Sequence, residues 1–190
     1  MTTQPDRSKR AGVSKGGTTV FLDLHKFPQP ELAGFANRCV LTNRGDHVEF
    51  AFIEDYTDGE MFWIARLVMP ADDALKRFWK SAENFYEQTS RLYPDEAMIR
   101  GRTGGEVPDA APTALVTNVV GTTRVGATGA LDFYYLTPRS LHIASTMKAS
   151  ERKGVLDVLP IATIQLATTT MIAFFRELRG IAESFPSGRK

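Results

Sequence analysis

Residues 48–53 read VEFAFI, and residues 131–136 read LDFYYL. Each stretch begins with an apolar residue, an acid and a phenylalanine before mixed aromatic and aliphatic residues, a composition typical of buried β-strands. Residues 67–70 and 157–160 form a second matching pair, and each of these stretches ends in a proline. An apolar stripe at helical spacing follows each proline. The order of strands, proline and helix therefore predicts an internal repeat.

The sequence predicts an α+β protein of two tandem β-β-β-β-α units, with antiparallel sheets that each carry one amphipathic helix. We expect the first unit over residues 18–93 and the second over residues 113–185, and the two units can form one composite domain. Apolar periodicity disappears where glycine, proline or charge accumulates. These stretches are a disordered basic tail at residues 1–17, a Gly/Pro linker at residues 94–112 and a second tail at residues 186–190.

Turn residues divide the units into their expected elements. Residues 43–46, Asn-Arg-Gly-Asp, predict a hairpin between strands at 38–42 and 47–53, because asparagine and glycine tolerate positive φ. A turn at residues 56–60 precedes a strand at 61–69. After Pro70, Asp72 and Asp73 favour a helix start, where carboxylates stabilise the positive end of the helix dipole. In the second unit, residues 141–147 alternate like a strand, and Pro160 is expected to open the second helix.

The predicted strands are apolar on both faces. Residues 61–68 place Met61, Trp63 and Leu67 on one face and Phe62 and Ile64 on the other. A sheet covered on one side only should alternate apolar with polar residues. One helix per unit covers one face, so the other face must meet a partner sheet, a second subunit or a ligand. Intramolecular packing or self-association is the favoured interpretation, since large exposed apolar patches are rare on monomers.

Composition restricts the classes of function. The 190 residues include 23 basic and 22 acidic side chains, and the resulting net charge of +1 weakens any attraction to nucleic acid or anionic lipid through overall charge. One cysteine, Cys39, cannot form an intrachain disulfide and favours a reducing compartment, so we expect a cytoplasmic protein that does not span a membrane. Three isolated histidines, with no nucleophile or phosphate-loop motif, predict no catalytic residue, metal site or cofactor.

Aromatic and basic residues on and near the predicted sheets suggest a binding surface. Lysine and arginine cluster around residues 148–153, where they could contact phosphates, and strand aromatics could stack on bases. The alternative is that these charges belong to solvated turns. The candidate binding residues are Trp63, Arg66, Tyr134, Lys148, Arg152 and Lys153.

Residues 66–70, RLVMP, and the apolar positions Ala74, Leu75, Phe78 and Phe85 that follow resemble small uncharacterised bacterial domains related to the SecB export chaperone. That resemblance implies an oligomer that holds unfolded chains on apolar grooves, although SecB is strongly acidic and has a single unit. The tandem β-β-β-β-α order also resembles, in topology alone, the Whirly and Pur-type single-stranded nucleic-acid binders. Neither resemblance transfers a motif residue, and fold analogy does not determine function.

Three functional hypotheses remain open at this point. The first is a non-enzymatic protein-binding or assembly module, chaperone-like or adaptor-like, that acts as a homo-oligomer and binds a protein partner. The second is a single-stranded nucleic-acid-binding protein of Whirly-like or Pur-like topology. The third is an enzyme whose site cannot be recognised from sequence.

Overall fold

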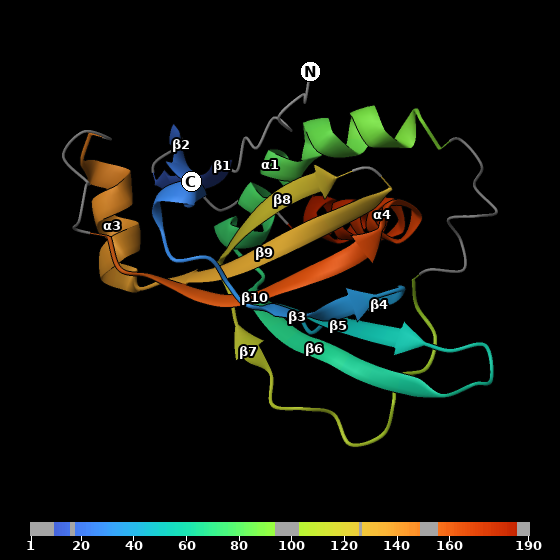
Figure 1. The fold of residues 1–190 in the computed structure, drawn as a ribbon. Coiled ribbons are helices and arrows are strands. Elements are labelled where there is room, and N and C mark those ends of the chain that lie inside the picture. The colour runs from blue at the N-terminus through green and yellow to red at the C-terminus, as the bar shows by residue number, and fades with distance from the viewer. Residues whose placement is uncertain (1–9, 16–17, 94–102, 126, 149–155, 186–190) are drawn as a thin grey trace.

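The computed structural model describes residues 10–15, 18–93, 103–125, 127–148 and 156–185. It contains two four-stranded sheets packed with helices, so the α+β prediction is confirmed (Figure 1). The first sheet has the strand order β4-β5-β6-β7, and the second has the order β3-β10-β9-β8. The strands of the first sheet are β4 Arg38–Asn43, β5 His47–Asp55, β6 Met61–Pro70 and β7 Leu115–Val116. Those of the second are β3 Leu32–Ala36, β8 Val119–Val125, β9 Thr128–Leu136 and β10 Val158–Ala167.

Both sheets are mixed, which corrects the expectation of antiparallel sheets. Strands β4, β5 and β6 form an antiparallel meander, as do β8, β9 and β10. The strand that precedes each meander joins the opposite sheet: β3 pairs in parallel with β10, and β7 pairs in parallel with β6. Strands β3 and β7 pair with distant parts of the chain, so no residue near them in sequence indicates parallel pairing. Turn residues indicate only antiparallel neighbours, and the prediction from them gave purely antiparallel sheets.

Two asparagines fix the points where the chain passes from one sheet to the other. Asn37 separates β3 from β4, and its side-chain amide donates to Asp55 O and accepts from the Asp55 N–H, both at 2.8 Å. Asn118 follows β7 and precedes β8, and it makes the same two contacts with the backbone of Leu136, also at 2.8 Å. Each asparagine therefore satisfies backbone groups where a strand bends between sheets.

A β-bulge occurs at the same place in both meanders. In the first sheet the register shifts beside the pair Phe52–Ala65, which leaves Ile64 as the extra residue of β6. In the second sheet it shifts beside the pair Phe133–Ala162, which leaves Ile161 as the extra residue of β10. A bulge bends its strand and increases the local twist.

These registers correct the sequence alignment of the two halves. Phe52, rather than Phe50, matches Phe133 in its pairing. Counted from the two bulges, residues 67–70 of β6 take the same positions as residues 164–167 of β10.

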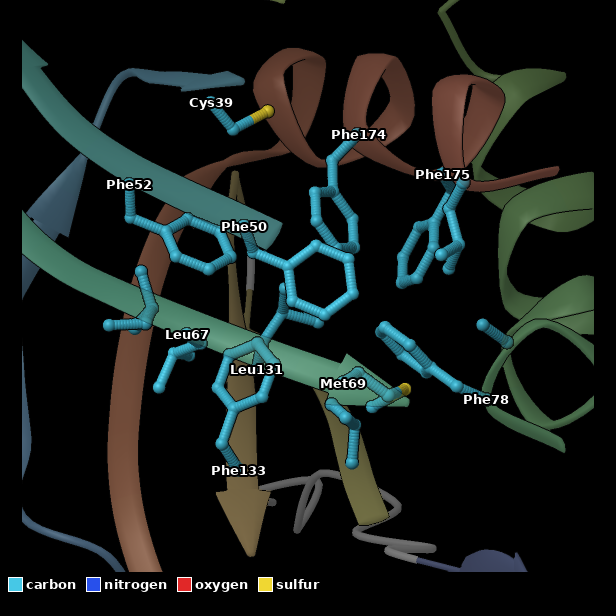
Figure 2. Packing of buried hydrophobic residues seen from close by; sticks show 14 of the residues in the cluster. Cys39, Phe50, Phe52, Leu67, Met69, Phe78, Leu131, Phe133, Phe174 and Phe175 are labelled. Atoms are coloured by element: carbon cyan, nitrogen blue, oxygen red, sulfur yellow. The ribbon is translucent and has the colours of Figure 1, made fainter. Parts of the chain in front are cut away.

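The main core lies between the inner faces of the two sheets and helices α1 Asp73–Ser90 and α4 Thr168–Ser184. Phe50 and Phe52 of β5 meet Phe133 of β9, with ring centroids 6.4 and 5.6 Å apart (Figure 2). Phe174 of α4 contacts both β5 rings, and Phe78 of α1 packs on Phe174 at 6.0 Å. This continuous aromatic cluster joins the two halves into one packed unit.

Helix α1 begins where the sequence predicts. Pro70 ends β6, and Asp72 is the N-cap, with its carboxylate accepting from the Ala74 N–H at 2.6 Å. Its buried residues include Ala74, Leu75 and Phe78, as expected from the apolar stripe.

Of the predicted strand at residues 141–147, all but the last residue lie in helix α3 Pro138–Thr146, and Met147 is its C-cap. Thr137 is the N-cap and accepts from the Ser140 N–H, while Pro138 occupies the first turn, where its missing N–H is not needed. Ala144 is buried in the second sheet's outer cluster, with Leu141 packed against it, and Ser140 is buried as well. The run is so short that its alternation did not distinguish helix from strand.

The predicted helix after Pro160 also begins later, because residues 158–167 form strand β10. Pro160 lies next to the bulge, where proline is tolerated within a sheet. Ile164 and Leu166 face the core while Gln165 is exposed, a period of two that continues to the start of α4 at Thr168. The β-branched residues Ile161, Thr163 and Ile164 favour this extended conformation.

A small hairpin precedes the two sheets. It pairs β1 Arg10–Lys15 with β2 Thr18–Asp23, so part of the segment predicted to be a disordered tail is a strand. A single 3-10 turn, η1 Leu24–Lys26, follows and leads toward β3. The predicted tail at residues 186–190 lies outside the described residues, as do residues 1–9, 16–17 and 94–102.

Candidate binding face of the first sheet

The outer face of the first sheet is the side turned away from α1 and α4. Register and alternation place Arg38 of β4, Ala51 and Ile53 of β5, and Trp63 and Arg66 of β6 on this face. Ala51 and Ile53 are nonetheless buried. Another part of the protein therefore covers the outer face of the first sheet, as the apolar residues on both faces of the predicted strands required.

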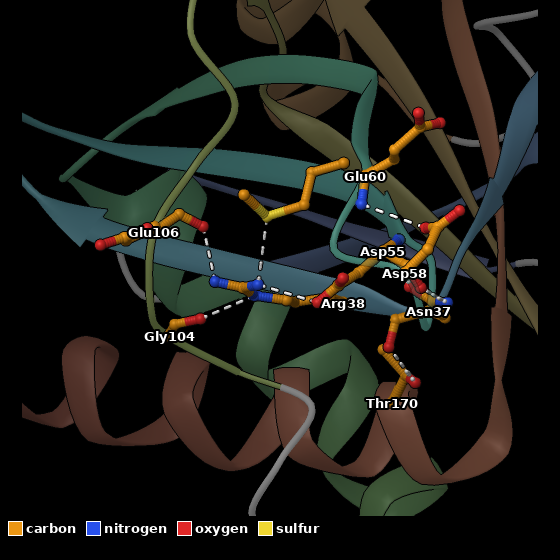
Figure 3. A network of polar contacts seen from close by, with 9 residues as sticks. Asn37, Arg38, Asp55, Asp58, Glu60, Gly104, Glu106 and Thr170 are labelled. Carbon is orange, nitrogen blue, oxygen red and sulfur yellow. Dashed lines mark hydrogen bonds and ion pairs between the residues drawn. The ribbon is translucent and has the colours of Figure 1, made fainter.

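The cover is the segment 103–112, called the strap below, which runs under the sheet toward β7 (Figure 1). The side chain of Arg38 donates to Gly104 O at 3.0 Å and to Glu106 O (Figure 3). The Trp63 indole N–H donates to Pro108 O at 3.1 Å. The predicted linker is thus held on the sheet by side-chain donors that reach its backbone carbonyls.

A fourth contact lies near the end of the strap. Arg66 Nη1 donates to Pro112 O at 3.4 Å, the longest of the four contacts. All four acceptors are carbonyl oxygens of the peptide backbone.

Ion pairs hold the two arginines in position. Arg38 Nη1 lies 2.9 Å from Asp55 Oδ2, and Arg66 Nε lies 2.6 Å from Glu49 Oε1. The Arg66 guanidinium, with burial opposing it, holds the pKa of Glu49 below its ordinary value. The side chains of Arg38 and Glu49 are only 15% and 13% exposed, so these pairs are ordered and lose little further freedom when the guanidinium binds a carbonyl.

The start of the strap is bound at a second point, beside β4 and α4. Gly104 N donates to Cys39 O at 3.1 Å, and Thr103 Oγ1 donates to Glu177 Oε1 of α4 at 3.0 Å. Gly105 has φ +89°, and any Cβ there would collide with the Arg38 guanidinium. Glycine at this position lets the strap approach Arg38 closely.

The structure brings together only part of the predicted binding surface. Trp63 and Arg66 share the outer face of the first sheet, as described above. Tyr134 lies in the second sheet, where it is fully buried, and its hydroxyl donates to Gln29 Oε1 at 3.4 Å. Burial also raises its pKa. The prediction that Tyr134 forms part of a binding surface is therefore wrong, because both faces of β9 are covered.

The basic candidates lie elsewhere. Lys148 is exposed after α3, which Figure 1 places at the other end of the molecule from the hairpin between β5 and β6. Arg152 and Lys153 lie outside the described residues. Arg38 was not among the predicted binding residues. The residues around it indicate only a β-strand, and the carbonyls that it binds lie 66 and 68 residues away in the sequence.

The outer face of the second sheet is covered in a different way. Leu22 and Leu24, from the segment that leads into β3, pack with Tyr134 and Leu136 of β9. Helix α3 contributes Ala144 to the same cluster. A Cβ on Gly121 of β8 would lie 2.9 Å from Leu24 Cδ1, so the cover sits directly on the strand. This face is part of a second apolar core.

Searches for other kinds of site gave negative results within the described residues. That part of the chain holds no group of three or more histidine, cysteine or carboxylate side chains placed to bind a metal ion. Among the helices described, none is both long and apolar enough to cross a membrane. No protein-family model, curated protein or solved structure matches the chain. The resemblances to SecB-related domains and to Whirly and Pur-type proteins therefore stay predictions.

Proposed function

We propose that the outer face of the first sheet binds a polypeptide segment through its backbone carbonyls, and that the protein is a non-enzymatic protein-binding module. The observation that carries this proposal is the row of donors from Arg38, Trp63 and Arg66 to backbone carbonyls of the strap. In this state the strap occupies the face as an internal ligand. A partner segment replaces it by offering its own carbonyls to the same donors.

Polypeptide fits this face better than nucleic acid. Single-stranded nucleic acid needs unpaired basic groups and aromatic rings open for stacking. Here Arg38 and Arg66 each pair with a carboxylate, and Trp63 is partly buried with its N–H bound to the strap. Neutral carbonyls suit guanidinium groups whose charge is already balanced, whereas phosphates would compete with Asp55 and Glu49.

The proposal extends to self-association. A strap released from one molecule presents the same carbonyls to the face of a second copy, which exchanges identical segments between protomers. The size in solution of the native chain, compared with that of the strap-replaced variant described below, tests this part separately. A particle that stays monomeric with and without its native strap would contradict exchange but not peptide binding.

We infer further that the two halves are copies of one β-β-β-β-α unit whose first strand is exchanged. Three matched features support this: the parallel pairing of β3 and β7 with the opposite sheet, the clamps at Asn37 and Asn118, and the bulges at Ile64 and Ile161. In each half the segment before the exchanged strand covers the sheet that this strand joins. The strap thus corresponds in position to the segment before β3.

The decisive experiment replaces residues 104–111 with a flexible Gly/Ser segment about three times as long, whose own carbonyls occupy the donors for a smaller fraction of the time. It then adds a fluorescein-labelled peptide of residues 103–112. We expect this peptide to bind the replaced variant measurably and the native chain at least tenfold more weakly, because the native strap competes at high effective concentration. Adding Trp63→Phe to the replaced variant removes one donor and should weaken binding about five-fold, by loss of one hydrogen bond.

Lys80→Ala, on the exposed side of α1, is the matched control and should leave peptide affinity unchanged. A folded strap-replaced variant that does not bind the peptide would refute the proposal. Binding of oligothymidylate by the same variant, lost as salt rises, would favour the nucleic-acid hypothesis in its place.

A further inference from the structure

The hairpin between β5 and β6 carries two aromatic side chains that the core does not use. Tyr56 and Phe62 are 46% and 51% exposed, in a protein whose other central rings are buried. Their rings meet edge to face, with centroids 5.7 Å apart and planes at 88°. Exposed aromatic pairs of this kind offer a large apolar contact area.

Hydrogen bonds close the turn beneath these rings. Tyr56 N donates to Glu60 O at 2.9 Å, and Gly59 N donates back to Tyr56 O at 3.0 Å. Glu60 N donates to Asp58 Oδ1 at 3.2 Å. Because the turn is closed by its own hydrogen bonds, the rings are presented in one arrangement and little entropy is lost when a partner binds.

Carboxylates surround the ring pair. Glu54, Asp58 and Glu60 all lie close enough to the Tyr56 hydroxyl to raise its pKa, and the hydrogen bond that this hydroxyl donates to the Glu54 carboxylate is the largest cause. Asp55 is the exception, because it is paired with Arg38 on the outer face of the sheet. The tip is therefore a negatively charged aromatic surface in a chain whose net charge is +1.

We propose that this tip, through Tyr56 and Phe62, docks a lysine- or arginine-rich segment of a protein partner. The faces of tyrosine and phenylalanine rings attract cations, and the neighbouring carboxylates pair with the same groups. The same charge repels nucleic acid and anionic lipid. The proposal rests on the Tyr56 and Phe62 rings and not on the donors that hold the strap, so it stands independently of the function proposed for the sheet face.

A fluorescein-labelled decapeptide of alternating arginine and glycine is the probe, and fluorescence anisotropy with the full chain is the measurement. We expect saturable binding that weakens as salt rises. The double variant Tyr56→Ser, Phe62→Ser should bind about tenfold more weakly, since each ring–cation contact at an exposed site contributes a few-fold. Asp58→Asn with Glu60→Gln should also weaken binding and flatten its salt dependence.

Leu159→Ser is the matched control, because Leu159 is 45% exposed on β10 and belongs to the second sheet. It should bind the probe like the native chain. Circular dichroism of the double variant checks that the fold is intact, as expected for changes at exposed side chains. Equal affinity of the native chain and the ring variant would overturn the proposal. So would equal affinity for a decapeptide of alternating glutamate and glycine.

Discussion

Each sheet has its outer face covered by the segment that precedes its parallel strand, yet the two covers differ in kind. Leu24 is completely buried against the second sheet, whereas Val107 of the strap is 43% exposed over the first. The strap is held by side-chain hydrogen bonds to its carbonyls, and the segment before β3 is held by apolar contact. One cover is therefore part of the core, and the other is attached by groups that water or a peptide can replace.

The largest effect expected from this difference is on stability. Leu24→Ala should lower the free energy of unfolding by about 2–5 kcal/mol, because it leaves a cavity over Gly121 in the second core. Val107→Ala should change it by less than about 0.5 kcal/mol, as for surface positions generally. Urea unfolding of both variants measures the contrast. Similar losses for the two would show that the strap is as firmly packed as the other cover.

Asn37 and Asn118, whose side chains bind the backbone of Asp55 and of Leu136, allow a second comparison between the two sheets. Asn118→Ala should cost about 2 kcal/mol, because it leaves the buried N–H and C=O of Leu136 without their partner. Asn37→Ala should cost less, since Asp55 is partly exposed and water can reach its backbone. Thermal unfolding of the two variants tests the order. A larger loss of stability for Asn37→Ala than for Asn118→Ala would contradict this explanation, which depends on the burial of the backbone groups that each asparagine binds.

The ion pair behind the strap predicts a dependence of stability on pH. Arg66 lowers the pKa of Glu49 in the folded state, so the pair stabilises the fold above the ordinary glutamate value of 4.5. That contribution is lost as the pH falls through the lower folded-state value. Glu49→Gln should cost about 1.5 kcal/mol at pH 7 and progressively less as the pH falls below 4.5. A difference between native and variant chains that stays constant with pH would rule out this pairing.

The smallest expected effect is on the strap itself. Trp63→Phe removes the donor to Pro108 O and should lower global stability by about 1 kcal/mol or less. It should nevertheless raise the rate of limited proteolysis within residues 103–112 several-fold, because cleavage follows local opening. Leu24→Ala, although more destabilising overall, should not favour cleavage in the strap over other sites. Unchanged cleavage in the tryptophan variant would mean that the strap opens without breaking this hydrogen bond.

Sequence reasoning succeeded where the determining interactions are local. The hairpin between β4 and β5 follows from Asn43 and Gly45, whose amide oxygen and positive φ close the turn. The start of α1 follows from Asp72. Both features depend on residues within a few positions of each other, so a single sequence suffices to predict them.

It failed where the interactions are distant or ambiguous. The parallel partners of β3 and β7 lie in the opposite half, and α3 is too short for its periodicity to be read. Pro160 suggested a helix start, although it stands beside a bulge. The strap's contacts join residues 45 to 68 positions apart through backbone carbonyls, which no pattern of side chains reveals.

The exchanged strands also determine the order in which the chain can fold. Leu32 in β3 pairs with Thr163 in β10, across most of the chain, and β6 completes its sheet only when β7 arrives from the second half. During synthesis the first half must therefore wait with an unpaired strand until β10 leaves the ribosome, and pairings of such long range fold slowly. Cutting the chain between the two halves should give two fragments that are each incomplete and that complement each other when mixed.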